Sequence, residues 1–434
     1  MCSPKVTPGT AAAFGGVTDS LRNFGIPVAC CADGPSGIRM DCGTNAFSLP
    51  NGTALGCTFN VDLVKKLYKM TGIELCRNKI DSLLGPGMNI HRNPLNGRNF
   101  EYVSEDPILT GKIGAAQVIG IQEAGSTATI KHVCANNQEA SRRFVDSIVS
   151  ERALREIYLK GFEIAVKEGK ARSVMTTYNP VNGIWTAGSY DLCTTILRKE
   201  WGFDGIVMTD WWAEANTEGE KSTRENKAPM VLAQNDLYMC VSNSLENPEN
   251  DNVKERFEAG EVTRSDLQRN AKNILKFIMK SQAMLHELNL ISKEDLEEIN
   301  GQDDDGNISL EDIVYYYADK DSNDIIIDAS NFNNKKGDSE VFGISLNELG
   351  LYNIEITMKS EQGSLSQLPL SIYYDNALKS TITIRGTEGE WVTESRELGF
   401  IFGVNHYIKL YFGASGLDID KVVIKFMGKG KLPF

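Results

Sequence analysis

The chain has 434 residues, a length that suits more than one domain and leaves ample material for a large hydrophobic core. Hydrophobic residues make up 41% and charged residues 24%, as in soluble globular proteins, and no apolar run approaches the roughly 20 residues of a membrane-spanning helix. The net charge of −13 argues against nucleic acid or an anionic membrane surface as the partner and fits a neutral ligand.

The cysteines indicate a reducing compartment. There are nine of them, an odd number, Cys30 and Cys31 are adjacent, and none belongs to a CxxC pair. This pattern is typical of buried thiols rather than of a disulfide framework or a zinc site. The first residues show no basic segment followed by an apolar core, so we expect no signal peptide and a cytoplasmic location.

Residues 1–284 are predicted to form one α/β domain, because short apolar segments alternate there with amphipathic ones. The predicted strands are 26–31, 82–84, 129–133, 173–178, 206–209 and 230–233, and the predicted helices are 61–78, 109–123, 151–168, 190–199 and 264–280. Six to eight such units in roughly 280 residues favour a (β/α)8-type, TIM-like barrel. A doubly wound sheet is the weaker alternative, since no glycine-rich phosphate loop follows the first strand.

The composition changes after residue 284. Residues 285–324 are acidic and are predicted to be a linker. Within them, residues 303–312 resemble a calcium loop, but aligning Gly306 with the turn glycine puts Gly301 first and Asp312 last, which favours a solvated acidic segment. Residues 325–434 alternate polar and apolar side chains with period two, which predicts an all-β sandwich.

Polar side chains recur at the ends of the predicted barrel strands. In such barrels the carboxyl ends of the strands face the active site, and Asp210, followed by Trp211, stands at that end of the segment 206–209. Comparable positions belong to Asp33, Lys131, His132, Tyr178, Asn235 and Asp236, with Arg98 and Arg142 in nearby loops. Cations and carboxylates bind hydroxyl groups with charge-assisted hydrogen bonds, and aromatic faces stack on sugars. The set therefore predicts a site for a polyhydroxylated ligand.

Other interpretations of these residues stay open or are weaker. Lys131 could form a Schiff base, but nothing in the sequence shows the apolar pocket that this chemistry needs. His132 has no metal-ligand spacing to another histidine, so neither a metal nor a cofactor is expected. Ser36 does not lie in a GxSxG elbow. Asp210 could instead cap a helix, and the Arg and Lys side chains could form surface ion pairs.

Between about residues 25 and 275 the chain resembles glycoside hydrolase family 3. The motifs occur in the order of the family: Asp33-Gly34-Pro35-Ser36-Gly37, Gly97-Arg98-Asn99-Phe100-Glu101, Lys131-His132, Met175-Thr176-Thr177-Tyr178-Asn179, Trp201-Gly202-Phe203-Asp204-Gly205 and Val207-Met208-Thr209-Asp210-Trp211. The resemblance implies a retaining exo-β-glycosidase with Asp210 as the nucleophile. It also implies a sugar subsite made by Asp33, Arg98, Lys131, His132, Arg142, Met175 and Tyr178, with Trp211 beside it.

The implied substrates are terminal β-D-glucosyl residues of β-glucosides and cello-oligosaccharides, with glucose as the product. A β-xylosidase or an N-acetylglucosaminidase is the alternative within the family, although the Lys-His-Phe-Pro-Gly-His-Gly run of the latter is absent at Lys131-His132. Lys131 and Arg98 are expected to keep Asp210 ionised.

The sequence departs from the family in its acid/base residue, which usually comes from an α/β sandwich domain that follows the barrel. No segment after residue 284 has that pattern, and the chain resembles the second half of rumen bacterial β-glucosidases with swapped domain order. We expect a domain or chain outside this sequence to supply the acid, with Glu139 or Glu214 as local alternatives, and the chain alone to bind sugar without cleaving ordinary substrates. The C-terminal region resembles a carbohydrate-binding sandwich, with Trp391 and Tyr374 as candidate aromatics, and a purely structural sandwich is an equal alternative.

Overall fold

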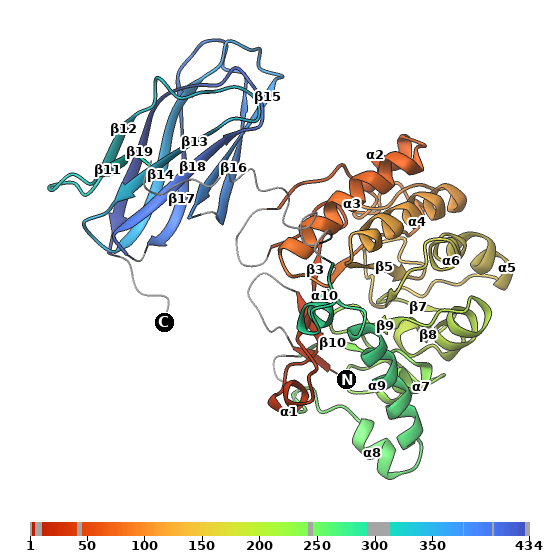
Figure 1. Cartoon of the computed structure of the whole chain (residues 1–434). Coiled ribbons are helices and arrows are strands. Elements are labelled where there is room, and N and C mark those ends of the chain that lie inside the picture. The colour runs from red at the N-terminus through yellow and green to blue at the C-terminus, as the bar shows by residue number, and fades with distance from the viewer. Residues whose placement is uncertain are drawn as a thin grey trace. The chain divides into compact units, whose positions relative to one another are not determined.

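The computed structural model describes residues 2–4, 11–40, 46–241, 246–292, 295, 313–375, 377–401 and 403–429. The chain divides into two units, Met1–Gln302 and Asp303–Phe434. The first runs from red to green in Figure 1 and the second is blue. Residues 303–312, which resemble a calcium loop but are predicted to be a solvated acidic segment, lie outside the described residues.

The first unit is a TIM-like barrel, as predicted. Its main sheet has the order β2 (Ala12–Gly15), β3 (Ala29–Asp33), β4 (Ser82–Leu84), β5 (Thr127–Val133), β6 (Ser173–Thr176) and β9 (Ile206–Met208). Neighbouring strands are parallel, except that β2 runs antiparallel to β3. A bridge from Met208 to Leu237 leads on to β10 (Tyr238–Val241), which pairs with β1 (Cys2–Pro4).

Helices cover the outside of this sheet (Figure 1), and the signals that begin them are visible in the sequence. Asn60 caps α3 (Val61–Arg77), Asp106 with Pro107 begins α4 (Pro107–Glu123), and Thr263 with Asp266 forms the capping box of α9 (Arg264–Ile278). The predicted helix 151–168 is divided by a wide-turn segment, Leu154–Tyr158, into α5 (Glu151–Ala153) and α6 (Lys160–Lys167).

The remaining elements of the first unit are short. They are α1 (Asp19–Asn23), α2 (Gly52–Cys57), α7 (Ala228–Ala233), α8 (Val253–Glu258), α10 (Gln282–Glu287), the hairpin of β7 (Pro180–Val181) and β8 (Ile184–Trp185), a turn of 3-10 helix at Thr186–Gly188 and a wide-turn helix at Asp191–Glu200. None of the helices in the described part of the chain is long and apolar enough to cross a membrane.

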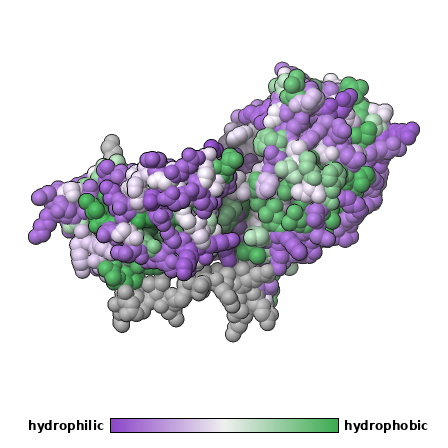
Figure 2. Space-filling view, turned by 90° about the horizontal axis from the view of Figure 1, so that it is seen from above, coloured by the Kyte–Doolittle hydropathy of each residue, from purple (hydrophilic) through white to green (hydrophobic). Residues whose placement is uncertain are grey.

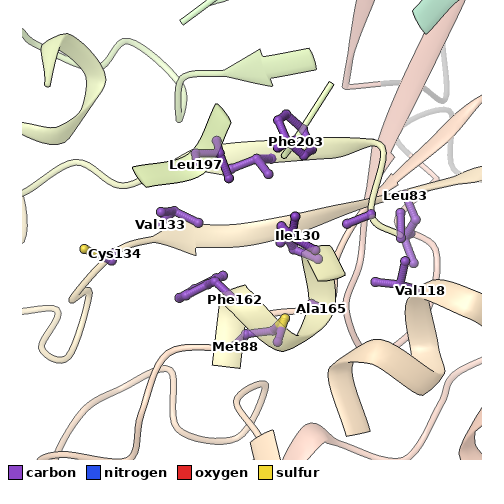
Figure 3. Packing of buried hydrophobic residues seen from close by; sticks show 14 of the residues in the cluster. Leu83, Met88, Val118, Ile130, Val133, Cys134, Phe162, Ala165, Leu197 and Phe203 are labelled. Atoms are coloured by element: carbon purple, nitrogen blue, oxygen red, sulfur yellow. The ribbon is translucent and has the colours of Figure 1, made fainter. Parts of the chain in front are cut away.

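The core of the barrel forms around β5, which is buried at every residue. Figure 3 shows Leu83 of β4 and Phe162 of α6 gathered about Ile130 and Val133 of β5. Each of these side chains is almost completely buried, and such burial stabilises the fold by about 1.5–3 kcal/mol per side chain. Polar residues cover most of the molecular face in Figure 2, with apolar residues in patches between them.

One predicted strand is wrong. Residues 230–233 belong to helix α7, because Ala228 and Pro229 begin a helix there and Gln234, in the left-handed conformation, ends it. A short apolar run does not distinguish a buried helix from a buried strand, so the pattern was ambiguous. The actual strand is β10, and Asn235 and Asp236 therefore precede a strand rather than end one. Asp236 accepts hydrogen bonds from Arg198 at 2.6 Å and from the backbone of Val207 at 2.9 Å.

The second unit is an all-β sandwich of two sheets. One sheet has the order β11 (Tyr315–Tyr317), β13 (Ser339–Ser345), β18 (Asn405–Phe412), β15 (Gln367–Tyr374) and β16 (Ala377–Arg385), and the other has β12 (Ile325–Asp328), β19 (Asp418–Gly428), β14 (Gly350–Lys359) and β17 (Val392–Ile401). Along β14 every second side chain is buried, including Ile354 and Ile356, and these pack with Ile372 and Ile408 of the opposite sheet. The alternation predicted from the sequence thus builds the core of the sandwich.

Candidate active site

A cavity of ≈ 490 Å³ opens at the carboxyl ends of the barrel strands. We call it the mouth cavity, and its lining is Ala11, Asp33, Arg39, Leu84, Arg98, Lys131, His132, Arg142, Met175, Tyr178, Asp210, Trp211, Trp212 and Cys240. All nine site residues that the sequence predicts lie in this lining. Most of them come together because β3, β4, β5, β6 and β9 are successive parallel strands of one sheet, so that their carboxyl ends meet at one edge.

Asp210 is buried in the wall of the cavity, two residues after β9. The backbone N–H of Trp211 donates to its Oδ1 at 2.7 Å, and Nε2 of His132 lies 3.8 Å from its Oδ2. Burial raises the pKa of Asp210 above its ordinary value, whereas the Trp211 N–H, Arg98, Lys131 and a hydrogen bond from Tyr178 oppose the shift. Arg98 and Lys131 therefore lower the pKa of Asp210, as expected from the sequence, but the effect of burial on this pKa is larger.

The buried Lys131 and the partly exposed Asp33 form an ion pair at the mouth of the barrel. The Nζ of Lys131 in β5 donates to Oδ1 of Asp33, the last residue of β3, at 2.6 Å. Arg39 lies 3.5 Å from the other oxygen of Asp33, on the exposed side. Burial alone would raise the pKa of Asp33, but Lys131 and Arg39 bring it below its ordinary value. Asp33 is thus an ionised acceptor in the cavity.

Two arginines place further positive charge at the cavity. Arg98 forms a buried ion pair with Glu101. Arg142 lies over the ring of Tyr178, with its guanidinium carbon 4.6 Å from the ring centre, and Arg143 lies at 4.8 Å. These contacts hold the side chains of the cavity wall in place before any ligand arrives, which is the preorganisation that tight recognition of a small polar ligand requires.

His132 is buried and neutral. Burial, together with Arg98, Lys131 and Arg142, lowers the pKa of its imidazole well below the ordinary value. Its backbone is held on both sides by the amide of Asn89, which accepts from the His132 N–H and donates to its carbonyl, each at 2.9 Å. The hydroxyl of Tyr102 lies 3.2 Å from its Nδ1.

The other carboxylates considered from the sequence are engaged elsewhere. Glu139 accepts hydrogen bonds from Arg142 at 2.8 Å and from Asn136 at 3.1 Å, and Glu214 accepts from Ser222 at 2.6 Å. Neither lines the mouth cavity. Within the described parts of the chain, Asp33 and Asp210 are the carboxylates of its lining. The same parts contain no group of three or more His, Cys, Asp or Glu side chains that could hold a metal ion.

Sequence reasoning missed three polar or aromatic members of the lining. Cys240 belongs to β10, the strand that was placed too early in the sequence. Trp212 adjoins the predicted Trp211, and its positive φ of 55° gives no signal in a sequence. Arg39 follows Asp33 by six residues, a spacing that no local pattern links to the site.

In the sandwich, the two candidate aromatics lie in different local surroundings. Trp391 is half exposed beside Lys359, whose Nζ lies 5.2 Å from its ring centre, and the hydroxyl of Tyr374 lies 2.6 Å from Nδ1 of His406. Strand β16 begins beside Tyr374 and ends six residues before Trp391. The nine residues of this strand extend over roughly 30 Å.

Comparison with known proteins agrees with the geometry of the barrel. The model of the glycosyl hydrolase family 3 N-terminal domain matches residues 12–277. A β-glucosidase of Ruminococcus albus is 51% identical over an alignment that covers 98% of this chain and 44% of that protein.

Solved structures give the same result. A β-glucosidase from Paenibacillus barengoltzii is 45% identical, with a TM-score of 0.64, and the match covers 98% of this chain and 45% of that one. β-Glucosidase 3B from Thermotoga neapolitana in complex with glucose is 39% identical, with a TM-score of 0.58, and the match covers 67% and 40%. This chain thus spans less than half the length of these relatives. The family match includes every predicted residue of the mouth cavity, and the chain belongs to glycosyl hydrolase family 3.

Proposed function

We propose that this chain is the nucleophile-bearing, sugar-binding half of a retaining β-glucosidase, which releases terminal glucosyl residues from β-glucosides and cello-oligosaccharides. The observation that carries the proposal is the position of Asp210 in the wall of a cavity that is also lined by a second carboxylate, a lysine and three arginines. Charged donors and acceptors of this kind suit the hydroxyl groups of one sugar ring. The similarity to enzymes named as β-glucosidases supports glucose as the sugar.

In the proposed reaction the carboxylate of Asp210 attacks the anomeric carbon and forms a covalent glycosyl-enzyme. The N–H of Trp211, Arg98 and Lys131 stabilise the negative charge that Asp210 must carry before the attack. Asp33 accepts hydrogen bonds from sugar hydroxyls, since its lowered pKa keeps it ionised. Trp211 and Trp212 lie at the same cavity and would contact the sugar or its leaving group.

The acid that protonates the leaving oxygen is proposed to come from a domain or chain outside this sequence. A retaining enzyme needs a second carboxyl group about 5–5.5 Å from the nucleophile, with a pKa high enough to hold a proton. Asp33 does not meet that need, because its pKa is lowered, and Glu139 and Glu214 do not line the cavity. The swapped domain order of rumen bacterial enzymes would place such a domain before this barrel.

The first test concerns Asp210. Asp210→Asn should lower turnover of dinitrophenyl β-glucoside by several orders of magnitude, because a covalent nucleophile is lost. The exposed Asp204→Asn, on the turn before β9, is the matched control and should retain the parent rate. A 2-deoxy-2-fluoro glucoside should label the peptide that contains Asp210. Labelling of a different carboxylate would contradict the assignment.

The alternative specificity is that of a β-xylosidase or another exo-glycosidase of the family. Comparison of kcat/KM for aryl β-glucosides and aryl β-xylosides distinguishes the two.

We also propose a reducing, cytoplasmic compartment, because Cys30, Cys31, Cys76, Cys134 and Cys193 are buried thiols. Burial raises the pKa of Cys30, Cys76, Cys134 and Cys193 to about 12, which makes these groups weak nucleophiles and poor partners for oxidation.

A further inference from the structure

A buried row of hydrogen bonds runs behind the wall of the mouth cavity and ends at His132. Arg142 donates to one oxygen of Glu139 at 2.8 Å, and Nδ2 of Asn136 donates to the other at 3.1 Å. The same Nδ2 donates to the hydroxyl oxygen of Tyr102 at 2.9 Å. That hydroxyl lies 3.2 Å from Nδ1 of His132. Tyr102, His132 and Asn136 are each no more than 2% exposed, so water does not compete for these groups.

The direction of every bond in this row follows from the groups present. A carboxylate only accepts hydrogen bonds, so Glu139 requires Asn136 to present its NH2 group rather than its carbonyl oxygen. Because that NH2 group also faces the hydroxyl of Tyr102, the hydroxyl oxygen acts as the acceptor there. The hydroxyl proton of Tyr102 is then directed at Nδ1 of His132, which must accept it.

We propose that Tyr102 is a positioning residue that fixes His132 in the tautomer with its single ring proton on Nε2. The Glu139 side chain, which does not touch His132, sets this direction through Asn136. Nε2 faces the cavity and lies 3.8 Å from Oδ2 of Asp210. The proton on Nε2 therefore points into the cavity, where it can be donated to a ligand. That this ligand is a sugar hydroxyl rests on the proposed function.

The opposite tautomer would be unfavourable in this place. With the proton on Nδ1, the lone pair of Nε2 would face the carboxylate of Asp210, and a donor for the ligand would be lost. A mismatched polar group in a buried site costs about 1–3 kcal/mol, which is enough to select one tautomer. A choice between two tautomers exists only for the neutral imidazole, because the doubly protonated ring donates from both nitrogens. The lowered pKa of His132 favours the neutral form.

The experiment is nitrogen NMR of the chain with labelled histidine, in the absence of any substrate. The chain has four histidines, so the signals of His132 are identified by their loss in His132→Gln. In the parent protein we expect an unprotonated Nδ1 and a protonated Nε2. The reverse assignment in the parent would overturn the proposal by itself, and no variant is needed for that outcome.

Two variants test the row. Tyr102→Phe removes the donor to Nδ1 and should give a mixture of tautomers. The matched control is Tyr68→Phe, which removes another buried hydroxyl, one that donates to the carbonyl of Pro35 at 2.9 Å. Glu139→Gln should reverse the row: Arg142 retains the one remaining oxygen, the new NH2 group faces Asn136, and the Asn136 amide turns its oxygen to Tyr102. The proton of His132 should then move to Nδ1.

Unchanged His132 nitrogen signals in both Tyr102→Phe and Glu139→Gln would contradict the proposal, and Glu139→Gln decides the question if Tyr102→Phe does not fold. Calorimetry with glucose gives the second measurement. Tyr102→Phe should weaken binding roughly 5- to 10-fold, whereas Tyr68→Phe should not. If the parent binds no glucose at all, the proposed function is contradicted. The nitrogen signals of His132 still decide the proposed tautomer, because they are measured without any ligand.

Discussion

At the scale of single residues, the ion pair of Lys131 and Asp33 predicts how much of the sugar affinity one charge carries. Lys131→Ala should weaken glucose binding by about 2–4 kcal/mol, because a buried charged donor is lost and the carboxylate of Asp33 loses its nearest cation. Asp33→Ala should do the same. Titration calorimetry measures both.

Lys112→Ala is the matched control for this prediction. Lys112 pairs with Glu168 at the same distance, 2.6 Å, but both side chains are about half exposed on the outer helices. Exposed ion pairs contribute about 0–1 kcal/mol to stability. We expect such a pair to contribute nothing to the affinity for a ligand that binds far from it. If Lys131→Ala titrates glucose like Lys112→Ala, the sugar does not bind where we place it.

Strand ends in the sequence were enough to group the candidate site residues around one cavity, and their roles stay predictions. Asp33, Lys131 and Asp210 stand at or just beyond the carboxyl ends of predicted strands, and parallel strands bring such ends together whatever the loops do. The tyrosine at position 102 was not predicted, although it contacts His132. Its role depends on a loop that folds back over the cavity wall, and local patterns do not encode such a contact.

At the scale of secondary-structure elements, Asp81 connects β3 to α10 and makes the barrel sensitive to pH. Its two carboxyl oxygens accept from the backbone N–H groups of Cys30 and Ala283, each at 2.8 Å. Burial raises the pKa of Asp81 to about 6, although these N–H groups oppose the shift. Because the folded pKa exceeds the unfolded one, protonation favours the fold.

The stabilising contribution of Asp81 is therefore fully present below about pH 4 and is lost as the pH rises through about 6. We expect the unfolding free energy of the parent, relative to Asp81→Asn, to increase by about 2–3 kcal/mol between pH 7 and pH 4. Urea unfolding followed by tryptophan fluorescence reports on the barrel, since four of the five tryptophans lie in the first unit. A difference that stays constant with pH would contradict the assignment, and the exposed Asp204→Asn serves as the control.

Helices and strands were predicted most reliably where the periodic pattern of apolar residues extended over a long segment. Helices α3, α4 and α9 and strand β14 each extend over ten residues or more, and all have either capping signals or clear alternation. The helix α7 has only six residues, all but one or two apolar, and it was mistaken for a strand. The reversed direction of β2 is a tertiary property that no local pattern contains.

At the scale of the whole molecule, we expect the chain to be chemically incomplete alone. Without an acid, a glycosidase cleaves substrates whose leaving groups are already acidic and stalls on ordinary glycosidic oxygens. The isolated chain should therefore release dinitrophenol slowly and leave cellobiose nearly intact. Addition of a separately expressed α/β sandwich domain from a related enzyme should restore cellobiose cleavage.

Full cellobiase activity of the isolated 434-residue chain, abolished by Glu139→Gln or Glu214→Gln, would contradict this prediction. It would place the acid inside the barrel. The two-unit organisation itself was predictable, because the apolar period is mixed between helix and strand up to residue 284 and is that of strands alone from residue 325. Whether the sandwich binds sugar was not predictable, since an exposed aromatic such as Trp391 looks the same in a binding surface and in a structural one.

Cys240 lines the mouth cavity, so its rate of alkylation can report whether a ligand is bound there. An alkylating reagent that modifies Cys240 must enter the space that a sugar would fill, whereas Cys57 is exposed on the outer surface. Peptide mass spectrometry after brief alkylation would then show protection of Cys240 by glucose, with Cys57 as the internal reference. Ligands for the cavity can be screened by such footprinting without turnover.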